Sequence, residues 1–161
     1  MNLWAPWRMG YILGPREEGC IFCDKPKENQ DERNLILLRG RHCFALLNLY
    51  PYSNGHLMIA PYRHVGRLPD LTQDECLEMM SFAQRAVAAL SQAVNAEAFN
   101  LGINQGGAAG AGIEEHLHLH VVPRWEGDTN FMPVLGAAKV IPQALEETYR
   151  LLRQALQASP P

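Results

Sequence analysis

Three histidines at alternate positions, His116, His118 and His120, form the part of the sequence best suited to chemistry. Side chains on a β-strand point to opposite faces in turn, so a strand here places the three imidazoles on one face and the apolar residues between them on the other. Burial of the apolar face fixes this register, because a slip of one residue would bury the imidazoles instead. The pattern therefore predicts a strand at residues 116–123 with one face lined by histidines.

Imidazoles spaced by roughly 6.6 Å along a strand can do either of two kinds of chemistry. Imidazole is largely unprotonated near neutral pH and can attack phosphorus, so the central His118 could act as nucleophile while its neighbours donate protons. The same His-x-His spacing also binds metal ions, as in a mononuclear metallohydrolase. The spacing alone supports both readings equally.

A glycine-rich stretch at residues 106–112 comes just before the histidines. Glycine lets the backbone approach a ligand closely, and neighbouring backbone amides can bind phosphate. Gly110 and Gly112 are the candidate substrate-binding positions here, although a merely flexible turn would have the same composition. A ligand that carries phosphate would suit both the loop and the histidines.

Two cysteines, Cys20 and Cys23, form a C-x-x-C pair, whereas Cys43 and Cys76 stand singly in apolar patterns. A structural zinc ion takes four protein ligands, so one such pair is half a site that histidines would have to complete. A reduced pair without metal is the alternative. A thioredoxin-like redox role is disfavoured, because no helix is apparent after the pair that would lower the pKa of the first thiol.

The surrounding sequence predicts one α+β domain built from about five strands and two helices. Short apolar runs predict the strands, and the first two are close enough to form a hairpin. Thr72 and Glu75 have capping-box spacing at the start of a long helix, and a C-terminal helix is expected to begin near Pro142. The predicted strands are 35–38, 42–47, 55–61, 98–104 and 116–123; the long helix buries Cys76, Met80, Ala83, Val87, Leu90 and Val94, and the last helix buries Leu145, Tyr149, Leu152 and Leu156.

At 161 residues, the chain has the length of a single domain with a substantial core. We expect an irregular segment at 1–34, a core at 35–125 and an extension at 126–161. The net charge of −3 lacks the basic surface typical of proteins that bind nucleic acid. No apolar run is long enough to span a membrane, and residues 1–10 lack an apolar signal core, so we expect a cytoplasmic protein without a membrane or nucleic-acid partner.

The residues from His116 to Val122 resemble the His-φ-His-φ-His-φ-φ signature (φ is apolar) of the histidine-triad (HIT) family of nucleotide hydrolases and transferases. Residues 48–57, NLYPYSNGHL, resemble the nucleotide-binding hairpin of that family. Residues 115–131 and the segment LWAPWRM at 3–9 are similar to its bacterial branch, which resembles diadenosine tetraphosphate phosphorylases. The resemblance covers nearly the whole chain and implies a single HIT domain.

The resemblance implies a role for each matching residue. His118 takes the position of the nucleophile, which would form a nucleotidyl-histidine intermediate. His120 and His56 match histidines that contact phosphate oxygens. Asn48 matches the residue that holds the ribose hydroxyls, and Gln105 matches an amide near the scissile bridge, with a solvent-facing loop residue as the alternative for Gln105. We expect these five side chains to share one site.

Some members of the family complete a zinc site with a C-x-x-C pair and two histidines. The matching positions here are His64 and His116, so the resemblance implies one structural zinc per chain, bound by Cys20, Cys23, His64 and His116. Such an ion would tie the irregular first segment to the catalytic strand and would leave the other two triad histidines for chemistry.

One departure from the family concerns the leaving group. Many members have Gln-Ser or Gln-Thr where this chain has Gly112-Ile113, so the corresponding hydroxyl or amide contacts are missing. The resemblance implies nucleotidyl transfer from dinucleoside polyphosphates to water or phosphate; the alternatives are phosphoramidate hydrolysis and nucleotide binding with negligible turnover. Members are commonly dimers, and Trp4, Trp7 and the chain from Pro133 could supply a homodimer interface, although the monomer core would bury them equally well.

Overall fold

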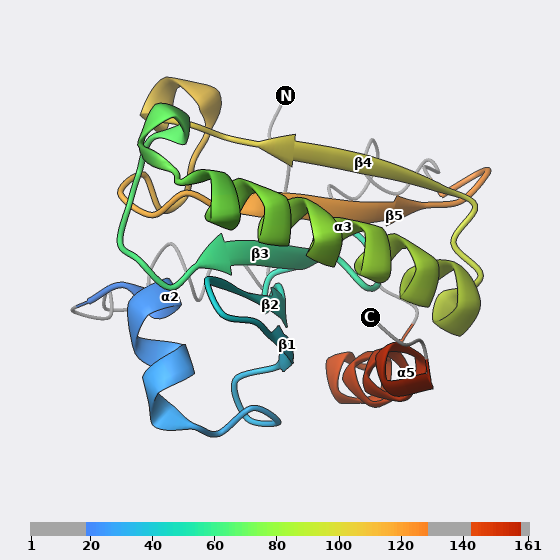
Figure 1. Cartoon of the computed structure of the whole chain (residues 1–161). Coiled ribbons are helices and arrows are strands. Elements are labelled where there is room, and N and C mark those ends of the chain that lie inside the picture. Colours follow the sequence, from blue (N-terminus) through green and yellow to red (C-terminus); the bar gives the residue numbers. More distant parts are fainter. Residues whose placement is uncertain (1–18, 129–142, 159–161) are drawn as a thin grey trace.

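The computed structural model describes residues 19–128 and 143–158 (Figure 1). The predicted dimer contacts at Trp4, Trp7 and 133–142, the motif at 3–9 and the predicted helix start at Pro142 lie outside these residues. Among the described helices, none is both long and apolar enough to cross a membrane. The elements are α2 (Ile21–Asp24), η1 (Lys25–Glu28), β1 (Ile36–Arg39), β2 (Cys43–Leu47), β3 (Leu57–Pro61), η2 (Leu68–Asp70), α3 (Gln73–Val94), β4 (Ala98–Ile103), η3 (Gly107–Ala109), β5 (Leu119–Arg124) and α5 (Leu145–Ala158).

The five strands form one antiparallel sheet in the order β1-β2-β3-β5-β4, which confirms the predicted α+β class. The first two strands pair as the predicted hairpin. The fifth strand begins later than predicted, at Leu119, so His116 and His118 lie in the extended segment that leads into it. In the register of β3 and β5, Met58 lies opposite His120.

The two faces of the sheet carry different apolar clusters. Figure 1 shows α3 lying across one face, where it covers Ile59, Leu119 and Val121. The opposite face carries a smaller cluster: Phe22, Ile36, Phe44, Leu46, Met58 and Ala60. The histidines belong to this second face, because His120 lies opposite Met58 in the sheet. The sheet face that carries the histidines is therefore also packed with apolar side chains, as is the face under α3.

The long helix α3 begins as predicted but turns a different face to the core. Thr72 Oγ1 accepts a hydrogen bond from the Glu75 amide, and the Thr72 amide donates to the Glu75 carboxylate, which completes the capping box. The predicted burial of Cys76 and Met80 is wrong, since both are exposed. The buried stripe starts at Glu75, whose carboxylate pairs with Arg63 at 2.7 Å. The rest of the stripe is Met79, Phe82, Ala83, Ala86, Ala89 and Leu90.

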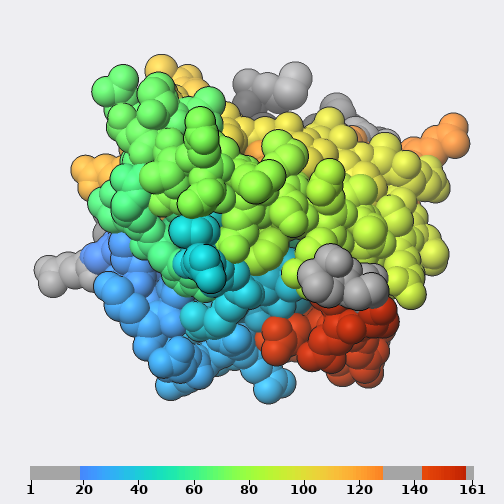
Figure 2. All heavy atoms as spheres, viewed as in Figure 1, coloured from blue at the N-terminus to red at the C-terminus, as the bar shows by residue number. Residues whose placement is uncertain are grey.

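A carboxylate on α3 also secures the β1–β2 turn. Glu78 accepts hydrogen bonds from three consecutive backbone amides, those of Arg41, His42 and Cys43, at 2.9, 2.6 and 2.6 Å. Figure 2 shows this turn pressed against α3. A side chain at Gly40 would clash with the Glu78 carboxylate, because a Cβ there would lie 2.5 Å from it. The helix and the hairpin are thus held together by the half-buried Glu78 carboxylate.

Helix α5 covers one edge of the sheet. Tyr149 Oη donates to the Ile36 carbonyl at 3.1 Å, and Arg153 donates to the Leu37 carbonyl at 2.9 Å. The predicted inner face of this helix is confirmed, with Tyr149, Leu152 and Leu156 buried and Leu145 packed against the core. Two backbone carbonyls of the edge strand β1 therefore accept hydrogen bonds from side chains of α5. The other edge strand, β4, is mostly exposed.

Candidate active site and metal centre

The sheet order brings His56 to the triad. His56 immediately precedes β3, and β3 pairs with β5, which carries His120. Gly55 permits the turn before His56, because its φ is +77° and a Cβ there would lie 2.7 Å from Leu90. The ring centroid of His120 lies 5.1 Å from that of His56 and 4.8 Å from that of His118. Three predicted catalytic histidines thus gather at one place.

Hydrogen bonds fix the proton positions on two of these rings. The Tyr52 amide donates to Nδ1 of His56 at 3.1 Å, and the Asn48 side-chain amide lies 3.4 Å from the same nitrogen. Because Nδ1 accepts, the neutral ring carries its proton on Nε2, which lies 2.9 Å from Nδ1 of His120 and donates to it. His120 is then protonated on Nε2. The relay leaves His120 with an N–H donor for a ligand.

His118 has the opposite tautomer. Its Nδ1 lies 2.8 Å from the backbone carbonyl of His116. A carbonyl can only accept, so Nδ1 carries the proton and Nε2 carries the lone pair of the neutral ring. The contact therefore gives the central histidine a nucleophilic nitrogen, beside a neighbouring ring that presents a proton donor. This arrangement can perform nucleophilic catalysis with a hydrogen bond to the group under attack.

Burial keeps these imidazoles neutral. It lowers the pKa of His118 below its ordinary value, and it lowers the pKa of His120 to about 4, with the nearby His118 as a second cause. His118 is only 5 % exposed. The expectation that register keeps the imidazoles out of the interior is thus wrong, because the aromatic ring of Phe22 packs against this face. The consequence favours nucleophilic chemistry, since an unprotonated ring is the reactive form.

The remaining predicted substrate residues have partners of their own. Asn48 Oδ1 accepts from the Tyr50 amide at 2.9 Å, which orients the side chain beside His56. The Gln105 side chain is exposed, and its Oε1 accepts from the Leu68 amide at 2.8 Å, so it anchors the loop before α3. Gly110 has a φ of +81°, and both it and Gly112 are exposed. Contacts of these residues with substrate stay predictions.

The four predicted metal ligands come together. One ligand atom from each of Cys20, Cys23, His64 and His116 lies within 4.8 Å of every other. The Cys20 Sγ and Cys23 Sγ atoms lie 3.2 and 3.5 Å from His116 Nδ1, and Cys23 Sγ lies 3.3 Å from His64 Nδ1. A tetrahedron with zinc bonds of about 2.0–2.3 Å has edges near 3.6 Å. The donor set and its spacing fit zinc.

Groups around the ligands prepare them for a metal. His116 Nε2 lies 2.8 Å from the Pro61 carbonyl and donates to it, so Nδ1 is unprotonated and directed at the thiols. A four-residue helix, α2, follows Cys20, which corrects the expectation that no helix follows the pair. The thiol of Cys23 nevertheless has a raised pKa, first because of burial and then because of Cys20. The raised pKa of Cys23 does not suit a low-pKa redox thiol.

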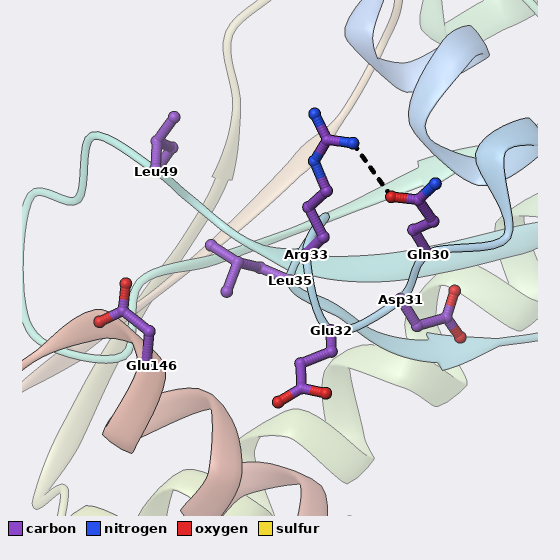
Figure 3. A pocket seen from close by; sticks show the side chains of 7 residues that line it. All are labelled: Gln30, Asp31, Glu32, Arg33, Leu35, Leu49 and Glu146. Atoms are coloured by element: carbon purple, nitrogen blue, oxygen red, sulfur yellow. Dashed lines mark hydrogen bonds between the residues drawn. The ribbon is translucent and has the colours of Figure 1, made fainter.

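A separate hollow of about 600 Å³ lies between the turn before β1 and the start of α5 (Figure 3). Arg33 in its wall donates to Gln30, and the lining also holds three carboxylates, those of Glu32, Glu146 and Asp31, the last of which pairs with Arg39. Their negative charge would oppose the binding of a polyphosphate. The hollow therefore does not suit a ligand that carries several phosphates. The hollow is lined by Gln30, Asp31, Glu32, Arg33, Leu35, Leu49 and Glu146.

Comparison with known proteins decides the family. The model of the HIT domain matches residues 29–127, more than half of the chain. The chain belongs to the HIT family. The match of this HIT protein includes all three triad histidines and His56, whereas α2 and α5 lie outside it.

Individual relatives of this HIT protein match over longer stretches. It is 45% identical over 160 residues to an AP-4-A phosphorylase of Mycobacterium tuberculosis, a match that covers 94% of this chain and 82% of the relative. It is 36% identical over 85 residues to a bis(5'-adenosyl)-triphosphatase of Dictyostelium discoideum, covering 53% and 56% of the two chains. A crystal structure of a zinc-bound HIT protein from Mycobacterium smegmatis superposes with a TM-score of 0.72 at 30% identity, covering 87% and 94%.

Two aromatic residues of the site escaped the analysis of the sequence. Tyr52 stacks on His56 with ring centroids 4.9 Å apart, and Phe22 lies 4.7 Å from His118. Both occur inside motifs that were identified for other residues, the hairpin for Asn48 and His56 and the C-x-x-C pair for its thiols. The only sequence signal for Tyr52 and Phe22 is that each lies between two residues already predicted to belong to a site.

Proposed function

We propose that this HIT protein is a nucleotidyl-transfer enzyme that cleaves dinucleoside polyphosphates at an α-phosphate through a nucleotidyl-His118 intermediate. The observation that carries the proposal is the tautomer of His118, whose Nδ1 donates to the His116 carbonyl and whose Nε2 therefore holds the lone pair. The ring centroid of His120 lies 4.8 Å from that of His118, and His120 carries its proton on Nε2. A nucleophile and a hydrogen-bond donor are thus adjacent before substrate binds.

In the first step, His118 Nε2 forms a bond to the α-phosphorus, and the bond from that phosphorus to the bridging oxygen breaks. His120 Nε2–H donates a hydrogen bond to the phosphate oxygens and so stabilises the negative charge that builds up on them. From diadenosine tetraphosphate the departing group is ATP, and an adenylyl group stays on His118. The step needs no oxidant or metal-bound water.

In the second step, an oxygen nucleophile attacks the same phosphorus, and the bond between phosphorus and His118 breaks. Inorganic phosphate as nucleophile yields ADP, whereas water yields AMP. We favour phosphate, because the AP-4-A phosphorylase relative is 45% identical over 94% of this chain. Asn48, Gln105 and the amides of Gly110 and Gly112 bind the nucleotide in this proposal, while the fully buried His56 orients His120.

We also propose that Cys20, Cys23, His64 and His116 bind one zinc ion per chain. The ion would supply a structural cross-link between α2 and the segment before β5, and His116 would then take no part in proton transfer. Elemental analysis of protein purified without added metal tests this site. About one equivalent of zinc is expected, and less than a tenth of an equivalent would exclude the site.

A homodimer and a cytoplasmic location complete the proposal. Strand β4 is an edge strand with exposed backbone groups, and its Leu101 is 46% exposed, which suits pairing with a second copy. None of the four cysteines forms a disulfide, as is usual in a reducing compartment. Light scattering should give twice the chain mass of 18.0 kDa, and Leu101→Glu should shift the protein toward the single-chain mass.

Product analysis tests the catalytic proposal. Diadenosine tetraphosphate is incubated with the enzyme in the presence and absence of inorganic phosphate, beside His118→Ala. ADP and ATP that form only with phosphate identify a phosphorylase. AMP and ATP formed regardless of phosphate identify a hydrolase. Full turnover by His118→Ala, or no turnover by the parent enzyme, contradicts the proposal.

A further inference from the structure

Phe22 connects the metal centre to the nucleophile. It stands between the two cysteine ligands in the sequence, and it is 0% exposed. Its ring centroid lies 4.7 Å from that of His118 and 5.2 Å from that of His116, with interplanar angles of 33° and 47°. Since the ring is fully buried, it acts on the histidines and not on solvent or a bound ligand.

His118 needs such a contact because its hydrogen bond leaves one motion open. A single bond from Nδ1 to the His116 carbonyl allows the imidazole to tilt about the line that joins the two atoms. His120 meets His118 at 72°, as an edge contact, which restricts one side. Phe22 packs at a shallow angle against the ring, so it limits the tilt that would move Nε2. The direction of the lone pair therefore depends on Phe22.

The position of Phe22 depends in turn on the metal ligands. Helix α2 has four residues, too few to be stable alone. The Cys23 and Asp24 amides donate to the Cys20 carbonyl at 2.8 and 2.9 Å, which closes a single turn around Phe22. The thiols on both sides of this turn reach His116. Ligation of the two cysteines would hold Phe22 at both ends.

We propose that Phe22 is a positioning residue that fixes the imidazole plane of His118, and that metal binding by Cys20 and Cys23 acts on the nucleophile through this ring. The kinetic part of the proposal rests on the proposed nucleotidyl transfer. Its structural part, a contact between Phe22 and His118 that depends on the metal, stands independently of turnover. The two parts have separate tests.

The kinetic test compares Phe22→Ala with Phe22→Leu, with Ile21→Ala as the matched control. Ile21 lies in the same turn and packs against the same apolar cluster. Misplacement of a reacting group by about 1 Å can cost roughly 100-fold in rate, so Phe22→Ala should lower kcat by about 10- to 100-fold with little change in KM. Phe22→Leu, which keeps most of the volume, should recover part of kcat, and Ile21→Ala should keep it. A raised KM with unchanged kcat would overturn the proposal, because it would make Phe22 a nucleotide contact.

The structural test uses nuclear Overhauser effects between the Phe22 ring protons and the His118 ring protons in the full-length parent protein. Cross-peaks are expected in the zinc-loaded protein and should vanish after chelation while the sheet signals remain. Cross-peaks that persist after chelation would overturn the link between the metal and the nucleophile. If the parent protein turns over no dinucleoside polyphosphate, the proposed function fails, and this measurement alone decides the inference about Phe22.

Discussion

At the scale of single residues, nearby backbone groups prepare the histidines. His118 donates to a carbonyl two residues before it, and His56 accepts from an amide four residues before it. These bonds form wherever the two segments take their native path, so the tautomers follow from the fold. Spacing predicted which histidines would gather, but it could not predict the tautomers, because these depend on ring orientation.

Substitution of His56 tests the relay. In His56→Leu, Nδ1 of His120 loses its hydrogen-bond donor. The proton of the His120 ring can then move from Nε2 to Nδ1, so that no N–H faces the ligand. Loss of a positioned hydrogen-bond donor costs about 100-fold or more, and kcat should fall by at least that factor. His56→Gln keeps an N–H donor near the position of Nε2 and should lose much less. Steady-state kinetics that show equal losses in both variants would reject the relay.

Glu75 provides a residue-scale prediction about pH. The Arg63 guanidinium lowers the pKa of Glu75 from 4.5 to about 2. A lowered pKa stabilises the fold above pH 4.5, and this stabilisation disappears as the pH falls from 4.5 toward 2. The shift corresponds to roughly 3 kcal/mol, and screening at the half-exposed Arg63 reduces it to about 1–2 kcal/mol. Glu75→Gln should therefore lose about 1–2 kcal/mol of unfolding free energy at pH 7 and much less near pH 2.5.

Urea unfolding at both pH values measures this difference. Glutamine keeps the acceptor for the Thr72 amide, so the substitution isolates the charge. Glu147→Gln is the control, since Glu147 pairs with Arg150 at 3.8 Å where both side chains are exposed. A loss at Glu75 that is the same at pH 7 and pH 2.5 would argue against the ion pair.

At the scale of elements, the periodicity of apolar residues predicted the positions of the strands and of the two longer helices. Alternation placed the five strands within a few residues, and the capping box placed the start of α3. The predicted stripe of α3 was wrong at Cys76 and Met80, because apolar residues also occupy the neighbouring face of the helix, and the packing of that face in the core decides between the two. The short α2 was missed because a single turn has no period. Tertiary contacts decide such cases.

Helix α5 also supports the site, although it lies beyond the residues matched by the HIT domain. Thr148, which is fully buried, places its hydroxyl 3.0 Å from Asn54 Oδ1, in the loop between Asn48 and His56. Thr148→Val removes this hydroxyl at nearly constant volume. We expect a loss of about 1–2 kcal/mol in unfolding free energy and a raised KM for the nucleotide, because the loop loosens. If steady-state kinetics of Thr148→Val give an unchanged KM, α5 does not support the nucleotide site.

At the scale of the whole molecule, the proposed zinc ion would fasten residues 19–34 to the catalytic side of the sheet. The opposite side has a larger core under α3 and α5, which should stay folded without metal. Chelation should therefore lower Tm by roughly 5–10 °C and leave most helical signal at 25 °C, since metal that binds only the folded state stabilises it. Cys23→Ser should already melt at the lower temperature and should not respond to chelator. If chelation leaves the Tm of the parent protein unchanged, the proposal of a structural zinc ion is contradicted.

The central claim is that His118 carries the nucleotidyl group. The most direct measurement is to quench the enzyme during turnover of diadenosine tetraphosphate at neutral pH and to map any adenylyl adduct by peptide mass spectrometry, with His118→Ala and His120→Ala in parallel. The account predicts one acid-labile adduct, on His118, in the parent enzyme and in His120→Ala, and none in His118→Ala. An adduct on another residue, or rapid turnover without any adduct, would contradict it.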